Sequence, residues 1–305
     1  MPPAPWPDRG CRYIGRDGFE YDDLVRALMD RGAFTPRDEP VHVPALTAEA
    51  DASPPHQGAA RVWIVCGLKE GTLDRASLEL LSKAVELAPA LGGGVGAVVL
   101  AGDETTLQVA GAAAAAHGAD VVYTALDPAL TDYRAEPWAR VITEAVGTHH
   151  PEAVLFAATT SGRDLAPRVA SALGTGLAAD CTDLYVDSWS RQGTTYEGLV
   201  HMVRPAMAGG VLATCLCPEA RPQMATVRPG ALTARPLPAP DCVARTFAAP
   251  PPETFGDRVT VEDRGAGHDA IDLQDYEIVV CCGMGVGDSE TIRDVVDPFC
   301  SALAS

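Results

Sequence analysis

Short apolar runs alternate with amphipathic segments between Arg61 and Thr160. Four of these runs are almost continuously hydrophobic, which is typical of strands buried on both faces of a sheet; they cover residues 61–67, 96–102, 119–126 and 152–160. The first intervening segment places Leu78, Leu81 and Val85 at helical spacing, behind a possible capping residue at Asp74 or Ser77. Strands alternating with helices predict a Rossmann-like α/β domain with a parallel sheet.

The pattern changes after Gly176, where strand-like segments follow one another without helices between them. These segments are residues 195–204, 209–217 and 223–230. Consecutive strands with short connections normally pair antiparallel. We therefore expect an antiparallel extension at one edge of the parallel sheet.

Proline and alanine are abundant on both sides of this domain, which favours linkers over packed elements. The N-terminal region holds one amphipathic candidate helix, from Tyr21 to Met29. The composition predicts four parts: an extension (1–60), the α/β domain (61–233), a crossover (234–256) and the start of a second α/β domain (257–305).

The predicted second domain begins with an apolar run at residues 276–282, a glycine turn at Gly283–Gly287 and a helix from about Ser289. One strand and one helix cannot bury an independent core, so we expect this domain to be incomplete at Ser305. A glycine turn before a helix can hold an anion on its backbone N–H groups. A simple capped turn is an equal alternative, because the third-glycine spacing of the dinucleotide fingerprint is missing.

Composition and charge limit the class of partner. The 305 residues are 47% hydrophobic and 21% charged, which is ordinary for a globular protein. A net charge of −18 disfavours nucleic acid and anionic membranes and favours basic or neutral proteins. The longest uncharged run, Leu87 to Gly102, is shorter than a membrane span, so no membrane insertion is expected.

Nine cysteines contain no Cys-x-x-Cys pair. Their spacing matches neither a zinc nor an iron–sulfur ligand set, so no metal site is predicted. An odd number of cysteines without a signal peptide fits a reducing compartment, and we expect a cytoplasmic protein.

Ser161 follows the fourth apolar run, within the stretch TTSGRD (159–164). A hydrolase elbow requires Gly-x-Ser-x-Gly, and here a glycine stands only at Gly162. No catalytic nucleophile is therefore predicted. Thr160, Ser161 or Asp164 is instead expected to cap a helix that begins near Arg163–Asp164, because Pro167 is tolerated best in a first turn.

Charged residues near the ends of the predicted strands are candidates for binding a partner. Ligands and partners of open α/β sheets collect at the carboxyl edge of the strands. Arginines in an acidic chain can meet a partner's carboxylates or a flavin's phosphates, and solvated turn arginines are an equally good interpretation. The candidate docking residues are Arg163, Asp164, Arg204, Arg221 and Arg228.

The order of these motifs resembles the α subunit of electron transfer flavoproteins, the EtfA/FixB family. The resemblance covers about residues 61–305 and is carried by TTSGRDLAPRVASALGTGLAADCTDL, RPAMAGGVLAT, RPQMATVRPGAL and the strand, glycine turn and helix that follow. It implies an electron carrier rather than a substrate-converting enzyme. FAD, in a heterodimer with a β-type subunit, would accept electrons from dehydrogenases, such as the acyl-CoA dehydrogenases of fatty acid β-oxidation, and pass them to a quinone reductase or another acceptor.

The resemblance also implies roles for particular residues. In the family the TTSGRD loop belongs to a non-catalytic domain that builds the heterodimer. The glycine turn approaches the flavin, which makes the candidate cofactor-binding residues Gly283, Met284, Gly285, Gly287 and Ser289. The family usually has arginine where Met284 stands, and its Gln-Thr-Gly and Ser-Gly-Ala-x-Gln-His segments do not occur before Ser305. A flavin-free interaction module is therefore an alternative function, and an adenine-nucleotide enzyme with the same type of sheet is a third.

Overall fold

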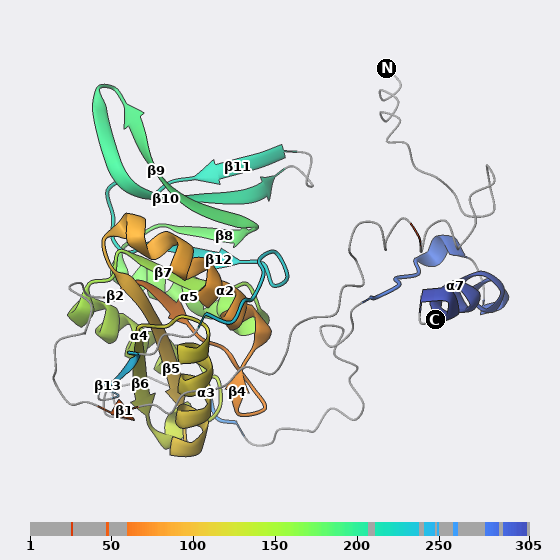
Figure 1. Cartoon of the computed structure of the whole chain (residues 1–305), viewed down its shortest axis with the longest axis horizontal. Helices are drawn as coiled ribbons and strands as arrows, with labels where there is room; N and C mark the ends of the chain where they lie inside the picture. The colour runs from red at the N-terminus through yellow and green to blue at the C-terminus, as the bar shows by residue number, and fades with distance from the viewer. Residues whose placement is uncertain are drawn as a thin grey trace. The chain divides into compact units, whose positions relative to one another are not determined.

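The computed structural model describes residues 26, 47–48, 60–206, 211–237, 241–247, 249, 259–261, 278–286 and 289–303. The chain divides into two compact units: Val41–Glu262, and Met1–Pro40 together with Asp263–Ser305 (Figure 1). The candidate helix from Tyr21 to Met29 lies outside the described residues except for Arg26, which is helical.

An eight-stranded sheet forms the centre of the larger unit. Every neighbouring pair of strands runs parallel, which confirms the predicted α/β class. The strands, in their order across the sheet, are β1 (Thr47–Ala48), β13 (Val243–Thr246), β6 (Val121–Leu126), β5 (Gly94–Ala101), β2 (Ala60–Val65), β7 (Ala153–Ala157), β12 (Gln223–Val227) and β8 (Leu177–Cys181).

Helices cover both faces of this sheet, as Figure 1 shows. Side chains of two helices pack with Val62 and Ile64 of β2 on one face, and those of two others pack with Trp63 and Val65 on the opposite face. This alternation follows from the two-residue period of a strand. The first pair is α2 (Arg75–Leu87) and α3 (Glu104–Ala116), and the second is α4 (Ala135–His149) and α5 (Thr160–Leu173).

Gly96 in β5 allows two aromatic rings to meet across the sheet. The rings of Trp63 and Tyr123 come from the strands on either side of β5, and their centroids lie 4.3 Å apart. A Cβ atom at Gly96 would lie 2.7 Å from Cδ1 of Trp63. The absence of a side chain at this position is therefore what lets the aromatic pair close over β5.

Polar side chains cap three of the four helices that cover the sheet, namely α2, α3 and α5. Asp74, one of the two predicted caps, accepts a 2.8 Å hydrogen bond from the backbone N–H of Ser77 at the start of α2. The cap of α5 is Thr159 and none of the three expected residues, so this helix begins at Thr160, three residues before the expected start near Arg163. The expectation for Pro167 was wrong, because it lies inside α5 and not in its first turn. A threonine hydroxyl before the helix satisfies an N-terminal N–H group and moves the start upstream.

A separate three-stranded antiparallel sheet lies next to β8, at the edge of the parallel sheet (Figure 1). It consists of β9 (Asp183–Arg191), β10 (Thr194–Ala206) and β11 (Val211–Cys215), in the order β11-β10-β9. The antiparallel pairing predicted for the first two segments after Gly176 is confirmed. The prediction was wrong for the third, because β12 is inserted parallel between β7 and β8. All its residues are buried, as a central parallel strand requires.

The amide of Gln223 joins the two sheets. β10 has a bulge between Tyr196 and Leu199, where Gly198 has a φ of 63°. The Gln223 side chain donates to the carbonyl of Gly198 (3.0 Å) and accepts from the N–H of Val200 (2.8 Å). These backbone groups flank the bulge, so the first residue of β12 holds the antiparallel sheet against the parallel one.

The proline-rich segment contains a strand that the sequence did not predict. β13 pairs in parallel with β6, and its ends are tied by hydrogen bonds from Val243 N to Asp120 O (3.1 Å) and from Phe247 N to Thr124 O (3.0 Å). A strand of four residues in a proline-rich segment is too short to show a recognisable two-residue period. The adjacent β6 supplies the pairing that the local sequence lacks.

In the smaller unit, Ile278–Cys282 forms no strand, contrary to expectation; residues 276 and 277 lie outside the described part. Val279 and Val280 are 43% and 37% exposed. A strand requires a neighbour for its backbone groups, and the described residues of this unit offer none. The helical elements that follow are η6 (Met284–Val286), α6 (Ser289–Thr291), η7 (Ile292–Val296) and α7 (Asp297–Leu303). Across the described residues, no helix has the length and apolar character needed to cross a membrane.

Candidate functional site

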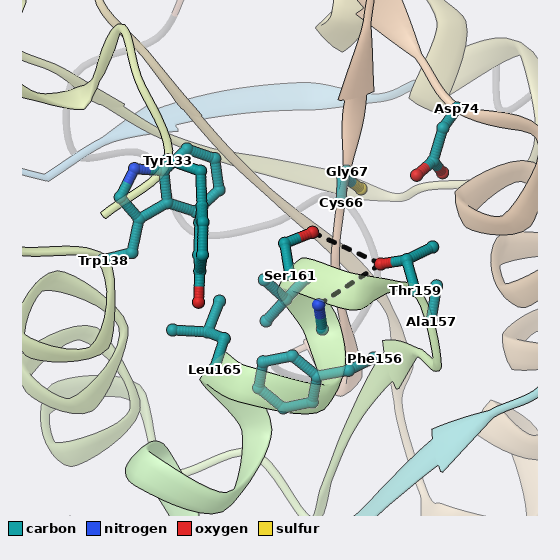
Figure 2. A pocket seen from close by; sticks show the side chains of 12 residues that line it. Cys66, Gly67, Asp74, Tyr133, Trp138, Phe156, Ala157, Thr159, Ser161 and Leu165 are labelled. Atoms are coloured by element: carbon teal, nitrogen blue, oxygen red, sulfur yellow. Dashed lines mark hydrogen bonds between the residues drawn. The ribbon is translucent and has the colours of Figure 1, made fainter. Parts of the chain in front are cut away.

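A pocket lies where the strand order reverses, at the carboxyl ends of β2 and β7. Open α/β sheets bind ligands at this type of position. The cavity here measures about 30 Å³, room for a water molecule or two, whereas ligand pockets span roughly 300–1,000 Å³. It is lined by Val65, Cys66, Gly67, Asp74, Tyr133, Trp138, Phe156, Ala157, Thr159, Ser161, Gly162 and Leu165 (Figure 2).

Ser161 in this pocket belongs to the hydroxyl network that starts α5. Its Oγ lies 3.3 Å from Oγ1 of Thr159, which also accepts from the N–H of Gly162 at 3.2 Å. A Cβ atom at Gly162 would lie 1.9 Å from the carbonyl oxygen of Ala157, so this position requires glycine. None of the described residues that line the pocket is a histidine. The Thr-Ser-Gly motif therefore builds a close strand-to-helix connection.

Two aromatic side chains narrow the pocket. Figure 2 shows Tyr133 and Trp138 on one side of Ser161 and Asp74 on the other. The rings of Tyr133 and Trp138 meet edge to face at 5.5 Å, and the Tyr133 hydroxyl donates to Asp164 at 2.9 Å. Burial, followed by this carboxylate, raises the pKa of Tyr133, so its hydroxyl remains a donor. The small volume of this pocket argues against the adenine-nucleotide alternative.

A second polar site, which we call the arginine cluster, consists of Arg163, Arg204 and Arg228 around Asp180. Arg163 donates from Nη2 to Oδ1 of Asp180 at 2.9 Å, and Arg228 donates from both Nε and Nη2 to the same carboxylate. Hydrogen bonding by Arg228 is the largest cause that lowers the pKa of Asp180, and the charges of Arg163 and Arg204 add to it. The carboxylate is therefore ionised. It binds the guanidinium groups of Arg163 and Arg228, and the charge of Arg204 also acts on it.

The fold brings these residues together at the carboxyl edge of the sheet. Arg163 lies in the first turn of α5, Arg228 directly follows β12, and Asp180 lies near the end of β8. Asp180 has a left-handed backbone (φ 62°) where β8 shifts register against β12, and its N–H donates to Oγ1 of Thr226 at 2.8 Å. Aspartate tolerates this conformation better than most residues. The sequence prediction missed Asp180, whose available signal was an acidic residue in an otherwise apolar strand.

The other two predicted docking residues lie elsewhere. Asp164 accepts from Tyr133 and from Arg168 (3.0 Å), beside the switch-point pocket. Arg221 bonds to Glu152 at 2.7 Å, at the amino end of the sheet. Arg221 precedes β12 and Arg228 follows it, so the length of the strand separates them. Three of the five predicted residues therefore share one site.

The predicted cofactor residues form an open turn in the smaller unit. Val286 donates to the carbonyl of Gly283 at 3.0 Å, and a Cβ atom at Gly283 or Gly285 would meet nothing within 4 Å. Met284 begins η6, Ser289 begins the three-residue α6, and Gly287 lies outside the described residues. A flavin requires an enclosed, largely apolar site. The described residues of this unit do not enclose one, so by themselves they do not fit the cofactor.

Sequence comparisons agree with this α/β architecture. Residues 62–252 match the model of the electron transfer flavoprotein domain. Protein FixB of Azorhizobium caulinodans is 36% identical over 270 residues, which cover 84% of this chain and 69% of FixB. Electron transfer flavoprotein α subunits from Thermoanaerobacterium thermosaccharolyticum and Megasphaera elsdenii are 41% and 33% identical, over 56% and 79% of this chain and 48% and 68% of their own lengths.

The fold and the comparisons define an electron transfer flavoprotein domain. The chain belongs to the electron transfer flavoprotein family, in the group of α subunits and FixB proteins. The matched regions span between 48% and 69% of the length of these three relatives. Membership of this family supports a function in electron transfer.

Proposed function

We propose that the chain is the α-type subunit of a cytoplasmic electron transfer flavoprotein and works as a heterodimer with a β-type subunit. The observation that carries this proposal is the family match over residues 62–252. Two structural features support it. The switch-point pocket is narrowed by Tyr133 and Trp138, which suits a docking domain better than a substrate-converting one. The arginine cluster, in contrast, is open to solvent.

The cofactor of this heterodimer would be FAD, which supplies redox chemistry when bound. Electrons would come from dehydrogenases, including acyl-CoA dehydrogenases, and leave to a quinone reductase or a similar acceptor. Enclosure of the flavin would need the β-type subunit and parts of the protein other than the open turn at Gly283 and Gly285. In this proposal the described part of the chain contributes the α/β domain, whose arginine cluster lies at the carboxyl ends of the parallel strands.

Co-expression with the β-type subunit from the same organism tests this function. We expect the two chains to co-purify, and the complex to show a flavin absorbance band that an acyl-CoA dehydrogenase and its substrate can bleach. No stable complex in either the presence or the absence of added FAD would contradict the proposal. The matched control is the β-type subunit expressed alone.

A flavin-free interaction module is the second candidate function. The exposed Val279 and Val280 beside the glycine turn favour it, because these side chains do not enclose a cofactor. Under this alternative the two chains would co-purify without flavin, even after incubation with excess FAD. The absorbance of the purified complex therefore separates the two candidates.

A further inference from the structure

We propose that the arginine cluster and the adjoining end of the antiparallel sheet are the docking site for a carboxylate-bearing segment of the β-type subunit. This inference rests on the proposed function, because it names the surface and the chemistry by which the heterodimer forms. It is carried by the charge of the cluster, by the hydrogen bonds that fix its guanidinium groups, and by an exposed apolar strand beside it.

The cluster is a positive site on an acidic protein. Arg163 and Arg228 donate to the carboxylate of Asp180, and the charge of Arg204 acts on the same carboxylate. The formal charge of these four residues is +2, whereas the whole chain carries −18. The carboxylate of Asp183, three residues after Asp180 in the chain, is paired with Lys83 at 3.3 Å. The side chains of Arg163 and Arg228 are 57% and 48% exposed, so an incoming group can reach them. Such a site attracts an acidic segment and rejects a basic one.

Arg163 and Arg228 are held in place before any partner binds. Nε of Arg163 donates to the carbonyl of Ala158 at 2.8 Å while its Nη2 donates to Asp180. Arg228 is held by two bonds to the same carboxylate. These bonds use only some of the N–H donors of each guanidinium group, and the rest remain for a second carboxylate. Since the side chains are already ordered, binding costs less conformational entropy.

An apolar surface continues from the cluster along the antiparallel sheet. Arg204 pairs with Ala213 and Ala206 pairs with Val211, which places these four side chains on one face. The Val211 side chain on this face is 53% exposed. Arginine beside exposed apolar residues is typical of protein–protein contacts. A phosphate group would use the arginines but not Val211, so the observations favour a protein carboxylate.

The next residue provides a matched control. Leu212 is 66% exposed, but strand alternation places it on the opposite face of β11. Arg221 is a second control, because it is an arginine paired with a carboxylate at the other end of the sheet. Each test variant therefore has a control with the same chemical change at a site outside the proposed surface.

The experiment measures the Kd between the full chain and the β-type subunit by titration calorimetry, at low and high salt. We expect Arg163→Gln with Arg228→Gln, and separately Val211→Asp, to weaken binding by roughly 10- to 1,000-fold. Arg221→Gln and Leu212→Asp should leave the Kd within about threefold. The salt dependence should be weaker for the double variant than for the unmodified chain. Arg204→Gln gives an additional test, because Arg204 makes none of the cluster's hydrogen bonds described above and its loss should spare the fold.

Several outcomes would overturn the inference. Unchanged affinity in the double variant and in Arg204→Gln, with a normal thermal melt, would remove the cluster from the interface. A larger effect of Leu212→Asp than of Val211→Asp would place the interface on the other face. Tight binding of pyrophosphate to the chain alone would make the cluster a phosphate site. If the unmodified chain forms no complex at all, the heterodimer itself is refuted, which is distinguishable from failure of this surface.

Discussion

Replacing Gln223 by methionine keeps the approximate size of a fully buried side chain and removes the amide that joins the two sheets. Gln223 is 0% exposed and bonds to Gly198 and Val200 of β10. The substitution leaves a backbone carbonyl and a backbone N–H without their partner. The lost bond to the buried N–H of Val200 costs about 1–3 kcal/mol and the lost bond to the half-buried Gly198 about 1 kcal/mol, so we expect a loss of roughly 2–4 kcal/mol in the free energy of unfolding.

Thermal and urea unfolding followed by circular dichroism measure this loss. For a unit of this size, 1 kcal/mol lowers the Tm by about 2–4 °C, so the expected decrease is roughly 4–16 °C. The matched control is Gln108→Met, on the exposed surface of α3, which should change the free energy of unfolding by less than about 0.5 kcal/mol. Trypsin should also cut faster at Arg191, at the end of β9, because the hairpin is held less firmly.

Two results would contradict the predicted role of Gln223. Equal Tm values for Gln223→Met and Gln108→Met would show that the amide bonds contribute no net stability. Faster cleavage at Arg191 without a change in the Tm would limit the role of Gln223 to local anchoring of the antiparallel sheet. Either result would contradict the magnitude derived from the two hydrogen bonds.

Three further predictions concern the parallel sheet and its helices. Gly96→Ala should destabilise the chain by about 1–3 kcal/mol in urea unfolding, because the new methyl group would overlap the ring of Trp63, and Gly147→Ala, where nothing lies within 4 Å, is the control. Thr159→Ala should cost about 1 kcal/mol through loss of the α5 cap, and Thr159→Ser should restore it. Burial, followed by the charge of Arg245, lowers the pKa of His149 below its ordinary 6.5. The unfolded chain therefore binds this proton at a higher pH than the folded chain does, so the free energy of unfolding should fall as the pH drops below 6.5. Urea unfolding at a series of pH values should show a smaller decrease in His149→Gln.

The parallel core was predictable because its information is local. Continuous apolar runs and helical spacing identified β2, β5, β6 and β7 and the helices between them. Asp74 was a recognisable cap because capping acts over three residues. The mismatch of Ser161 with a hydrolase elbow was also readable from its immediate neighbours.

The missed features depend on partners that are distant in the chain. β12 resembles the antiparallel segments before it. Its insertion between β7 and β8 follows from parallel pairing with residues 70 and 47 positions earlier, as in Gln223 with Ala153 and Met224 with Leu177. β13 was missed because only its pairing with β6 makes it a strand.

The same distinction between local and distant information applies to the candidate docking site. The sequence by itself determined that arginines stand beside strand ends in an acidic chain, and that Asp74 could start α2. Only the tertiary structure decided that Arg163 and Arg228, which are 17 and 48 residues from Asp180, share its carboxylate while Arg221 lies at the opposite end of the sheet. The physical reason is that residue type and spacing act over a few positions, whereas strand order sets which carboxyl ends meet.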